Sequence, residues 1–389
     1  MRHLLQTGSA IRRVWEQGLQ LKALHGAEAV ADMTLGNPAA PPPAALVEAL
    51  GQIVAESPAD LHLYTPNAGH PEVREQLAAH LHERGLLPGA RREHVVMTCG
   101  ASAAINIALR SVLEPGDEVL ILAPHFPDYP AHVLNHAGKP VIVPVGEDFL
   151  PDLGMIEAAL GERTRVLIVN HPNNPSGRQY PPSLIEELAT LLRGASQRAR
   201  RPIYLLSDEP YRELRFIREP FVSPARLYEY GLMAYSFSKS HSIPGERIGY
   251  LAINPGHPEA KELVRALSLA NRILGFTNAP SLWQRVIARC LDAVVDLEPL
   301  RRHRDRLVTA LADKGYDVLA PEGTFYLFPR TPGGDDEAFV QRALDQLLLV
   351  VPGGTFGRAG HFRIAFCVDE RTAALAAERL PHATVGGRA

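Results

Sequence analysis

The stretch RVLIVN, residues 165–170, is a short and almost uninterrupted apolar run. Similar runs recur along the chain: EVLILAP (118–124), PVIVPV (140–145), PIYLLSD (202–208), MAYSFS (233–238) and RIGYLAIN (247–254). Segments with a helical pattern separate these runs, and apolar runs of this length between helices are typical of a buried parallel sheet. The sequence therefore predicts a doubly wound α/β domain, with a large and mostly parallel sheet, over residues 46–294.

The two ends of the chain predict a second, smaller domain. Residues 9–26 have the spacing of an amphipathic helix and precede a proline-dense link, GNPAAPPPAA. After residue 294 polar helices alternate with short apolar stretches: DLEPLRRHRDRLVTALADKG (296–315), GTFYLFP (323–329), DEAFVQRALDQL (336–347) and HFRIAFCV (361–368). Residues 1–45 and 295–389 are therefore expected to form a small α+β domain.

The composition limits the classes of function. The 389 residues are 46% apolar and 21% charged, which are ordinary values for a soluble globular protein. A formal net charge of −3 gives no basic field for nucleic acid, and no run approaches the ~20 apolar residues of a membrane span. Charges interrupt the N-terminus before any signal-peptide stretch, and three distant cysteines predict neither disulfides nor a CxxC metal site. We expect a soluble cytoplasmic protein without nucleic-acid or membrane partners.

Chemically unusual loops follow the predicted strands. RVLIVN leads into HPNNPSG, PIYLLS into DEPY, MAYSFS into a lysine-containing segment, and VVMTC into GASAAI at a helix start. In open α/β sheets, ligands bind where the carboxyl ends of the strands meet such loops. The four loops are therefore expected to open on one edge of the sheet and to line one ligand site.

Lys239, in SFSKSHSIPGERIG (236–249), is unusual because lysine is rare in this chain. Only five of the 40 lysines and arginines are lysines, so arginine carries the generic positive charge. Lys239 lies between two serines, next to a predicted strand end and eight residues before Arg247. This pattern favours a chemical role over the ordinary alternative, a surface lysine at the end of a strand.

These segments resemble the fold-type I pyridoxal-phosphate (PLP) enzymes, specifically the class I/II aminotransferases. Matching landmarks follow the family's order over nearly the whole chain: LGNP, YTPNAGHPEVREQL, the GAS turn, PGDEV, NNPSG, SDEPY, SFSK with GERIG, PEGTFYLFP, PGGTFG and FRIAFC. A single SxSK is weak evidence, whereas ten landmarks in register are specific. The resemblance implies a fold-type I architecture, pyridoxal 5'-phosphate as cofactor, and transfer of an amino group between an L-α-amino acid and a 2-oxo acid.

The resemblance also implies roles around the cofactor ring. Lys239 would hold the cofactor aldehyde as a Schiff base and then move the α-proton, and burial would lower the pKa of its ammonium. Asp208 would keep the pyridine nitrogen protonated, and Tyr211 and Asn174 would hydrogen-bond the phenolic oxygen. Phe126 resembles the aromatic residue that stacks on the ring.

The cofactor's phosphate needs backbone donors and cations. At the GAS turn a predicted strand becomes a helix, and helix N-termini favour anions. Serine hydroxyls flank the lysine, and an arginine can bind two phosphate oxygens at once. The predicted phosphate site is Gly100, Ala101, Ser102, Ser236, Ser238 and Arg247.

The resemblance further implies how substrate and subunits are arranged. Arg363, on the predicted strand HFRIAFC, resembles the arginine that clamps the substrate α-carboxylate, a role that suits bidentate arginine. Gly36, Asn174 and His171 are the other predicted substrate-binding residues. Tyr64, in YTPNAG, resembles a tyrosine that reaches the phosphate of the neighbouring subunit. The implied assembly is a homodimer with shared active sites.

Several of these residues also have an ordinary structural alternative. Asp208 could cap a helix, Asn174 could belong to a plain turn, and Phe126 could pack in the core. Arg247 could form a surface ion pair, and Arg363 could face solvent on an alternating strand.

Three departures from the family's pattern keep the reaction open. Glu246 stands before Arg247, where the family commonly has an apolar residue, and His125 and His171 occupy loops expected to face the cofactor. Because histidine titrates near neutral pH, the alternative is an eliminating, replacing, cyclising or oxidising PLP enzyme on the same scaffold. A third hypothesis, a non-catalytic regulator, would need a DNA-binding segment that the sequence does not contain.

The sequence does not identify the substrate amino acid. A dicarboxylate would need a second arginine, for which Arg272 is the nearest candidate. No metal site is predicted, because His132 and His136 lie one helical turn apart without an acidic residue or a third ligand.

Overall fold

A computed structural model describes residues 10–383, so residues 1–9 and 384–389 of the predicted small domain lie outside the described residues. At its centre is a seven-stranded sheet in the order β2-β8-β7-β6-β5-β3-β4. The strands are β2 (Val95–Thr98), β3 (Glu118–Ala123), β4 (Lys139–Pro144), β5 (Thr164–Asn170), β6 (Tyr204–Asp208), β7 (Gly231–Ser236) and β8 (Gly249–Ile253). The predicted α/β class is confirmed.

Most of the sheet is parallel, as predicted. The pairs β7–β6, β6–β5, β5–β3 and β3–β4 are all parallel. Strand β8 alone runs against both of its neighbours, β2 and β7. The carboxyl ends of β5, β6 and β7 therefore point toward the same edge.

The predicted runs 233–238 and 247–254 differ from the observed strands at the ends nearest Lys239: the first passes the end of β7, and the second starts before β8. Strand β7 ends at Ser236, whose side chain accepts a hydrogen bond from the Ser238 backbone N–H and caps the short helix α9 (Phe237–Ser240). Strand β8 begins only at Gly249, because Arg247 has a φ of 53°, a left-handed conformation that a strand does not allow. As a result Lys239 lies on a helical turn.

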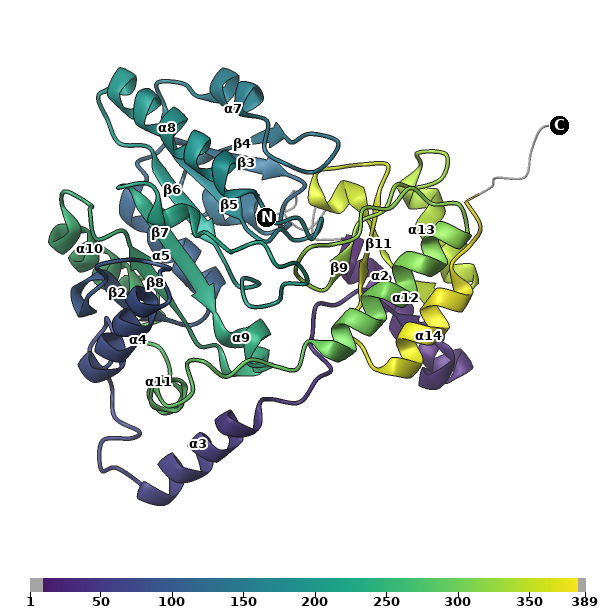
Figure 1. Cartoon of the computed structure of the whole chain (residues 1–389), viewed down its shortest axis with the longest axis horizontal. Helices are drawn as coiled ribbons and strands as arrows, with labels where there is room; N and C mark the ends of the chain where they lie inside the picture. The colour runs from purple at the N-terminus through teal and green to yellow at the C-terminus, as the bar shows by residue number, and fades with distance from the viewer. Residues whose placement is uncertain (1–9, 384–389) are drawn as a thin grey trace.

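Helices cover both faces of the large sheet (Figure 1). On β5, Val166 and Ile168 pack with residues of α5 and α10, whereas Leu167 and Val169 pack with residues of α8. Successive strand side chains point to opposite faces, so a strand covered on both sides needs a continuous apolar run.

The helices of this part of the chain are α3 (Ala44–Glu56), α4 (Pro71–Glu83), α5 (Ala101–Val112), α6 (Tyr129–Leu134), α7 (Leu153–Ala159), α8 (Pro182–Ala199), α10 (Ala260–Ile273) and α11 (Ser281–Ala288). Within residues 10–383, no helix has both the length and the apolar character needed to cross a membrane.

A second group of elements lies beside the large sheet (Figure 1). Its strands form two small sheets, in which β1 (Ala31–Asp32) pairs with β10 (Leu348–Leu349), and β12 (Phe362–Ala365) lies between β11 (Val351–Pro352) and β9 (Tyr326–Leu327). Its helices are α2 (Ala10–His25), α12 (Glu298–Asp313), α13 (Asp336–Asp345) and α14 (Glu370–Arg379). A buried cluster that includes Phe325, Phe339 and Phe362 joins them. The expected α+β elements are present, and the domain boundaries at 46 and 294 stay predictions.

The chain passes between the two groups of elements twice. Residues 33–43 lead from β1 to α3, and residues 289–297 lead from α11 to α12. Residues of both connections line the cavities described below.

Candidate active site

A cavity of about 340 Å³ lies at the carboxyl edge of the large sheet. The strands β5, β6 and β7 end here at Asn170, Asp208 and Ser236, and the first two of these residues are partners in the sheet register. Of the predicted site residues, the cavity brings together Gly36, Ala101, Ser102, Phe126, Asn174, Asp208, Tyr211, Ser236, Ser238, Lys239, Arg247 and Arg363. All four predicted loops therefore meet at one site.

Asp208 is the buried carboxylate of this cavity. Its Oδ2 accepts hydrogen bonds from Tyr129 Oη at 2.5 Å and from Asn170 Nδ2 at 3.4 Å. Its Oδ1 is buried and has no hydrogen-bond partner among the described residues. Burial raises the pKa of Asp208 to about 7, against the opposing effect of the Tyr129 hydrogen bond. An unpaired buried carboxylate oxygen is costly, so Oδ1 is suited to a cationic N–H donor in the cavity.

Lys239 reaches the cavity from the first turn of α9. Its Nζ donates a hydrogen bond of 2.6 Å to the carbonyl oxygen of Gly36. A side chain at Gly36 would not fit, because an added Cβ would lie 1.9 Å from Tyr326 Oη. Burial lowers the pKa of Lys239 to about 8. The amine therefore loses its proton at a lower pH than an exposed lysine does.

Arg363 is a buried guanidinium on β12. Its Nη1 donates to Asn174 Oδ1 at 3.1 Å, and its Nη2 donates to the Thr34 carbonyl oxygen at 2.6 Å. The guanidinium carbon lies 4.5 Å from the centroid of the Tyr326 ring and 4.6 Å from that of Phe356, while Nε has no partner within the described part of the chain. Its burial excludes the solvent-facing alternative. A fixed cation with a free donor suits a carboxylate ligand.

The predicted phosphate-binding residues meet at the start of α5. Arg247 Nη1 lies 3.4 Å from Ser238 Oγ, which is 2.7 Å from Ser236 Oγ. Gly100 precedes the helix with a φ of 82°, and an added Cβ there would lie 2.8 Å from Arg247 Nη2. A helix N-terminus, two hydroxyls and an arginine thus surround one place, which is the arrangement of an anion site.

Two histidines do not lie where the sequence places them. His171 is fully buried, stacks between the rings of Tyr180 and Phe221 at 5.0 and 4.8 Å, and accepts a hydrogen bond from the Tyr180 backbone N–H. His125 is also buried and does not line the cavity. The expectation that these histidines face the cofactor is therefore corrected.

The alternation of β5 explains the position of His171. Asn170 turns its side chain toward Asp208, and the next residue of an extended chain points the other way. Burial lowers the pKa of His171 to about 3, so the ring is neutral at physiological pH.

Tyr64 and Arg272 also lie outside the cavity. Tyr64 is 90% exposed in the segment between α3 and α4. Arg272 is exposed in the last turn of α10. Neither side chain reaches the site of its own chain, so their predicted roles depend on a second subunit.

Four residues of the site were not indicated by the sequence. Tyr129 and Asn170 hold Asp208, Thr34 holds Arg363, and Tyr326 Oη lies 3.3 Å from Tyr211 Oη. The one available signal was Asn170, a polar residue at the end of an apolar run. Within the described residues, no three His, Cys, Asp or Glu side chains come together as a possible metal site.

The doubly wound fold places a lysine, a buried carboxylate and two arginines around one cavity, an arrangement that suits an enzyme with an anionic ligand. The family model described as "Aminotransferase class I and II" matches residues 29–380. The chain therefore belongs to the class I and II aminotransferases and is a PLP-dependent transaminase.

Relatives with full-length similarity support this assignment. The chain is 33% identical to an aspartate/prephenate aminotransferase of Thermus thermophilus, over 98% of this chain and 97% of that one. The structure superimposes on an aminotransferase of Eubacterium rectale with a TM-score of 0.93, 34% identity, and coverage of 98% and 97% of the two chains. A Thermus thermophilus aspartate aminotransferase with maleate gives a TM-score of 0.85 at 30% identity, covering 97% of each chain.

Proposed function

We propose that pyridoxal 5'-phosphate binds in the 340 Å³ cavity and that Lys239, Asp208 and Arg363 carry out the reaction around it. The observation that carries the proposal is the buried Oδ1 of Asp208, which has no hydrogen-bond partner in residues 10–383 and lies in a cavity that also contains a lysine amine. A protonated pyridine nitrogen would satisfy this oxygen. The anion site at the start of α5 suits the phosphate, and Phe126 lines the same cavity as a ring-stacking residue.

Each residue has a distinct task in this proposal. When bound, pyridoxal phosphate supplies an aldehyde carbon that condenses with amines and a ring that draws electrons from the substrate α-carbon. Lys239 would hold the cofactor through Nζ, and its amine would take the proton from the substrate α-carbon. Asp208 keeps a positive charge on the ring nitrogen, and Tyr211 and Asn174 lie at the cavity wall to donate to the phenolic oxygen. Arg363 orients the substrate by its α-carboxylate.

The proposed substrates are an L-α-amino acid and a 2-oxo acid. Relatives named for aspartate and prephenate act on acids with a second carboxylate. Among the described residues that line the cavity, the cations are Lys239, Arg247 and Arg363, and each already has a task. A second substrate carboxylate would therefore need a cation from a partner subunit, for which exposed Arg272 remains the candidate.

A half-reaction tests the chemistry directly. Incubating the holoenzyme with each common L-amino acid, without an acceptor, should release at most one equivalent of 2-oxo acid per active site. Adding a 2-oxo acid should then restore repeated turnover. Repeated turnover with ammonia release in the absence of an acceptor would instead establish the eliminating alternative. The position of His171, away from the cavity, removes the observation that favoured that alternative.

Replacing Gly100 by alanine should weaken cofactor binding. The substitution places a Cβ 2.8 Å from Arg247 Nη2, at a φ of 82° and a ψ of 179°, a backbone region almost confined to glycine that costs another residue about 1–3 kcal/mol. We expect roughly tenfold more pyridoxal phosphate to be needed to reconstitute the apoenzyme, as measured by fluorescence titration. Gly116→Ala is the matched control, because its Cβ meets Arg163 at the same 2.8 Å with a φ of 85°. Equal cofactor affinities in the two variants would contradict the phosphate site.

We also propose that the enzyme is a homodimer in the reducing cytoplasm. The three cysteines are free thiols. Tyr64 is exposed together with Leu63, Val47 and Val54, which leaves apolar side chains of α3 and the following segment in solvent. Apolar surface of this kind is typical of an interface. In a dimer, this segment would carry Tyr64 to the phosphate of the partner.

Hybrid dimers test the shared site. Mixing Tyr64→Phe subunits with Lys239→Ala subunits should form some dimers in which one site carries both defects and the other carries neither. Activity should then exceed that of both parents, up to about a quarter of wild type for random pairing. Native mass spectrometry should confirm that the mixture contains the hybrid dimer. If the activity of that mixture never exceeds the activity of either parent variant, the sites are not shared.

A further inference from the structure

The first connection between the two groups of elements, residues 33–43, is hydrogen-bonded to both groups. The backbone N–H of Ala39 donates to the Cys367 carbonyl oxygen at 3.0 Å, shortly after β12 in the small sheets. The carbonyl oxygen of the next residue, Ala40, accepts a hydrogen bond of 2.5 Å from Ser242 Oγ, shortly after α9. The chain therefore passes from one group to the other between Ala39 and Ala40, and we call this point the junction.

The prolines of this connection explain why a side-chain hydrogen bond is needed at the junction. Pro41, Pro42 and Pro43 follow Ala40, and proline has no backbone N–H. These three residues therefore cannot hold the connection to the large-sheet group through a backbone donor. The Ser242 hydroxyl, which donates to the Ala40 carbonyl oxygen, supplies the hydrogen bond that the prolines cannot.

Ser242 has a backbone conformation that is rare for serine. Its φ is 55°, a left-handed value that glycine adopts readily and other residues adopt at a cost. Such conformations persist where the surrounding structure requires them, and they are frequent at functional sites. Glycine would fit the backbone better at this position, so the presence of serine points to a use of its hydroxyl.

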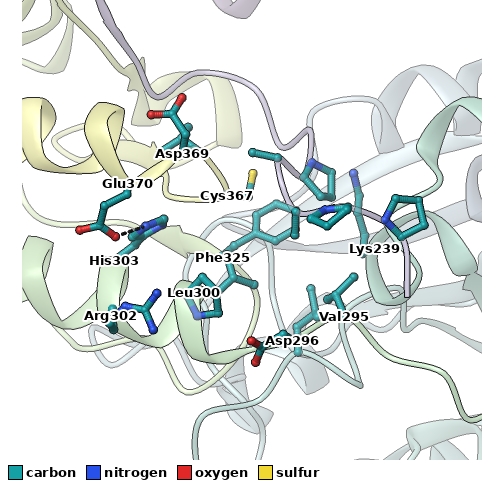
Figure 2. Close-up of a pocket in the computed structure, with 18 of the residues that line it drawn as sticks. Lys239, Val295, Asp296, Leu300, Arg302, His303, Phe325, Cys367, Asp369 and Glu370 are labelled. Carbon is teal, nitrogen blue, oxygen red and sulfur yellow. Dashed lines mark hydrogen bonds and ion pairs between the residues drawn. The ribbon is translucent and has the colours of Figure 1, made fainter. Parts of the chain in front are cut away.

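The second connection, residues 289–297, is bonded to the same turn. The backbone N–H of Val295 donates to the Ser240 carbonyl oxygen at 2.8 Å. A second cavity, of about 450 Å³, lies beside this contact, and Figure 2 shows Val295, Lys239 and Cys367 in its wall. Both connections are therefore held by the short segment that carries Lys239.

The first connection also contacts two residues of the proposed active site. The Thr34 carbonyl oxygen accepts a hydrogen bond of 2.6 Å from Arg363 Nη2, and the Gly36 carbonyl oxygen accepts one of 2.6 Å from Lys239 Nζ. When Nζ of Lys239 holds the cofactor, it keeps fewer protons to donate to Gly36. The Ser242 hydroxyl takes no part in that attachment, so its hydrogen bond is kept whether the lysine is free or bound.

We propose that Ser242 is a positioning residue for the transaminase, which fixes the junction and thereby the place of Arg363 relative to Lys239. Arg363 lies on β12 in the small sheets, whereas Lys239 lies on α9 beside the large sheet. A shift at the junction would change the distance between the group that binds the α-carboxylate and the amine, and small misplacements of such groups are costly. The inference rests on the roles proposed for Lys239 and Arg363. It extends them to a residue that does not line the cofactor cavity.

Two substitutions of Ser242 test the role of its hydroxyl. Ser242→Ala keeps a Cβ at the left-handed φ, whereas Ser242→Gly relieves that conformation, so a loss shared by both variants reports the missing hydrogen bond. The probe is 2-methylalanine, which has an amine and an α-carboxylate but no α-proton, and isothermal calorimetry on the holoenzyme gives its Kd. We expect this Kd to rise about threefold to tenfold in both variants, the effect of one hydrogen bond. The affinity of the apoenzyme for pyridoxal phosphate, measured by fluorescence titration, should stay unchanged.

A double-mutant cycle tests whether Ser242 acts through Arg363. Arg363→Lys keeps a positive charge but loses the fork of donors that suits a carboxylate, so it should weaken the binding of 2-methylalanine by itself. In that background Ser242→Ala should cause no further loss, because residues that act through one contact are not additive. Ser268→Ala is the matched control, because Ser268 Oγ also donates to a carbonyl oxygen, that of Val264, but within α10. It should leave the Kd unchanged.

Three results would overturn the inference while leaving the proposed function intact. The first is an unchanged Kd of 2-methylalanine in both Ser242 variants, each shown by circular dichroism to be folded. The second is the full loss in the Arg363→Lys background, which would mean that Ser242 does not act through Arg363. The third is an equal loss of affinity for pyridoxal phosphate, which would make Ser242 a structural support of the turn. A failure of the proposed function gives a different result, because Arg363→Lys alone would then bind 2-methylalanine as tightly as the wild type, and the inference would fall with it.

Discussion

Replacing Lys239 by alanine should abolish covalent attachment of the cofactor and transamination together. Among the described residues lining the 340 Å³ cavity, Lys239 supplies the one side-chain amine, and burial lowers its pKa to about 8. No neighbouring group can replace it, because the arginines of the cavity stay protonated. Loss of the group that moves the α-proton should slow turnover by roughly 10⁴-fold or more, as measured by steady-state kinetics with excess pyridoxal phosphate.

The chemical label identifies the residue independently of turnover. Borohydride reduction of the wild-type holoenzyme, followed by proteolysis and mass spectrometry, should place the cofactor on the peptide containing SFSK. Lys261→Ala is the matched control, because Lys261 is an exposed lysine at the start of α10, and it should keep both the label and full activity. A label on Lys261 or Lys139 would contradict the proposal that Lys239 binds the cofactor.

The large sheet could be predicted because its strands are covered on both faces. A strand such as β5 buries Val166 and Ile168 on one side and Leu167 and Val169 on the other, so the apolar run itself marks the strand. The antiparallel direction of β8 could not be predicted, because a buried strand has the same composition in either direction. The end of β7 depended on the Ser236 cap, a local hydrogen bond that the apolar pattern does not reveal.

The site was predictable where one residue type is chemically required. Lys239 was predicted from the rarity of lysine in this chain, whereas Asp208 and Arg363 were predicted from the resemblance to the family. The residues that hydrogen-bond to these side chains were not predicted, because they come from distant parts of the chain. Tyr129 lies 79 positions from Asp208 along the sequence, and only the folded structure brings the two together.

The error at His171 has a simple physical origin. A polar residue in a loop after a strand was expected to face the ligand, but Asn170 occupies that direction and His171 takes the opposite one. The two directions alternate residue by residue. A shift of one position therefore separates a site residue from a buried aromatic stack.

Replacing Asp208 by asparagine should slow transamination by about 10³-fold while leaving the protein folded. The substitution keeps the shape of the side chain and leaves Tyr129 and Asn170 beside it. It removes the negative charge of the carboxylate, whose Oδ1 has no partner in the described part of the chain. Without that charge, Asp208 would no longer hold a proton on the ring nitrogen of the cofactor, and the electron-withdrawing chemistry that the ring supplies would weaken. A 10³-fold loss corresponds to about 4 kcal/mol.

Tyr129→Phe separates the charge of Asp208 from its positioning. This variant removes the 2.5 Å hydrogen bond to Oδ2 but keeps the carboxylate, so its rate should fall only about tenfold, the effect of about 1.4 kcal/mol. The ¹⁵N chemical shift of labelled cofactor should report a protonated ring nitrogen in wild type and Tyr129→Phe and an unprotonated one in Asp208→Asn. If Asp208→Asn instead kept wild-type turnover and a protonated nitrogen, Asp208 would be a structural residue, and the buried Oδ1 would need another partner.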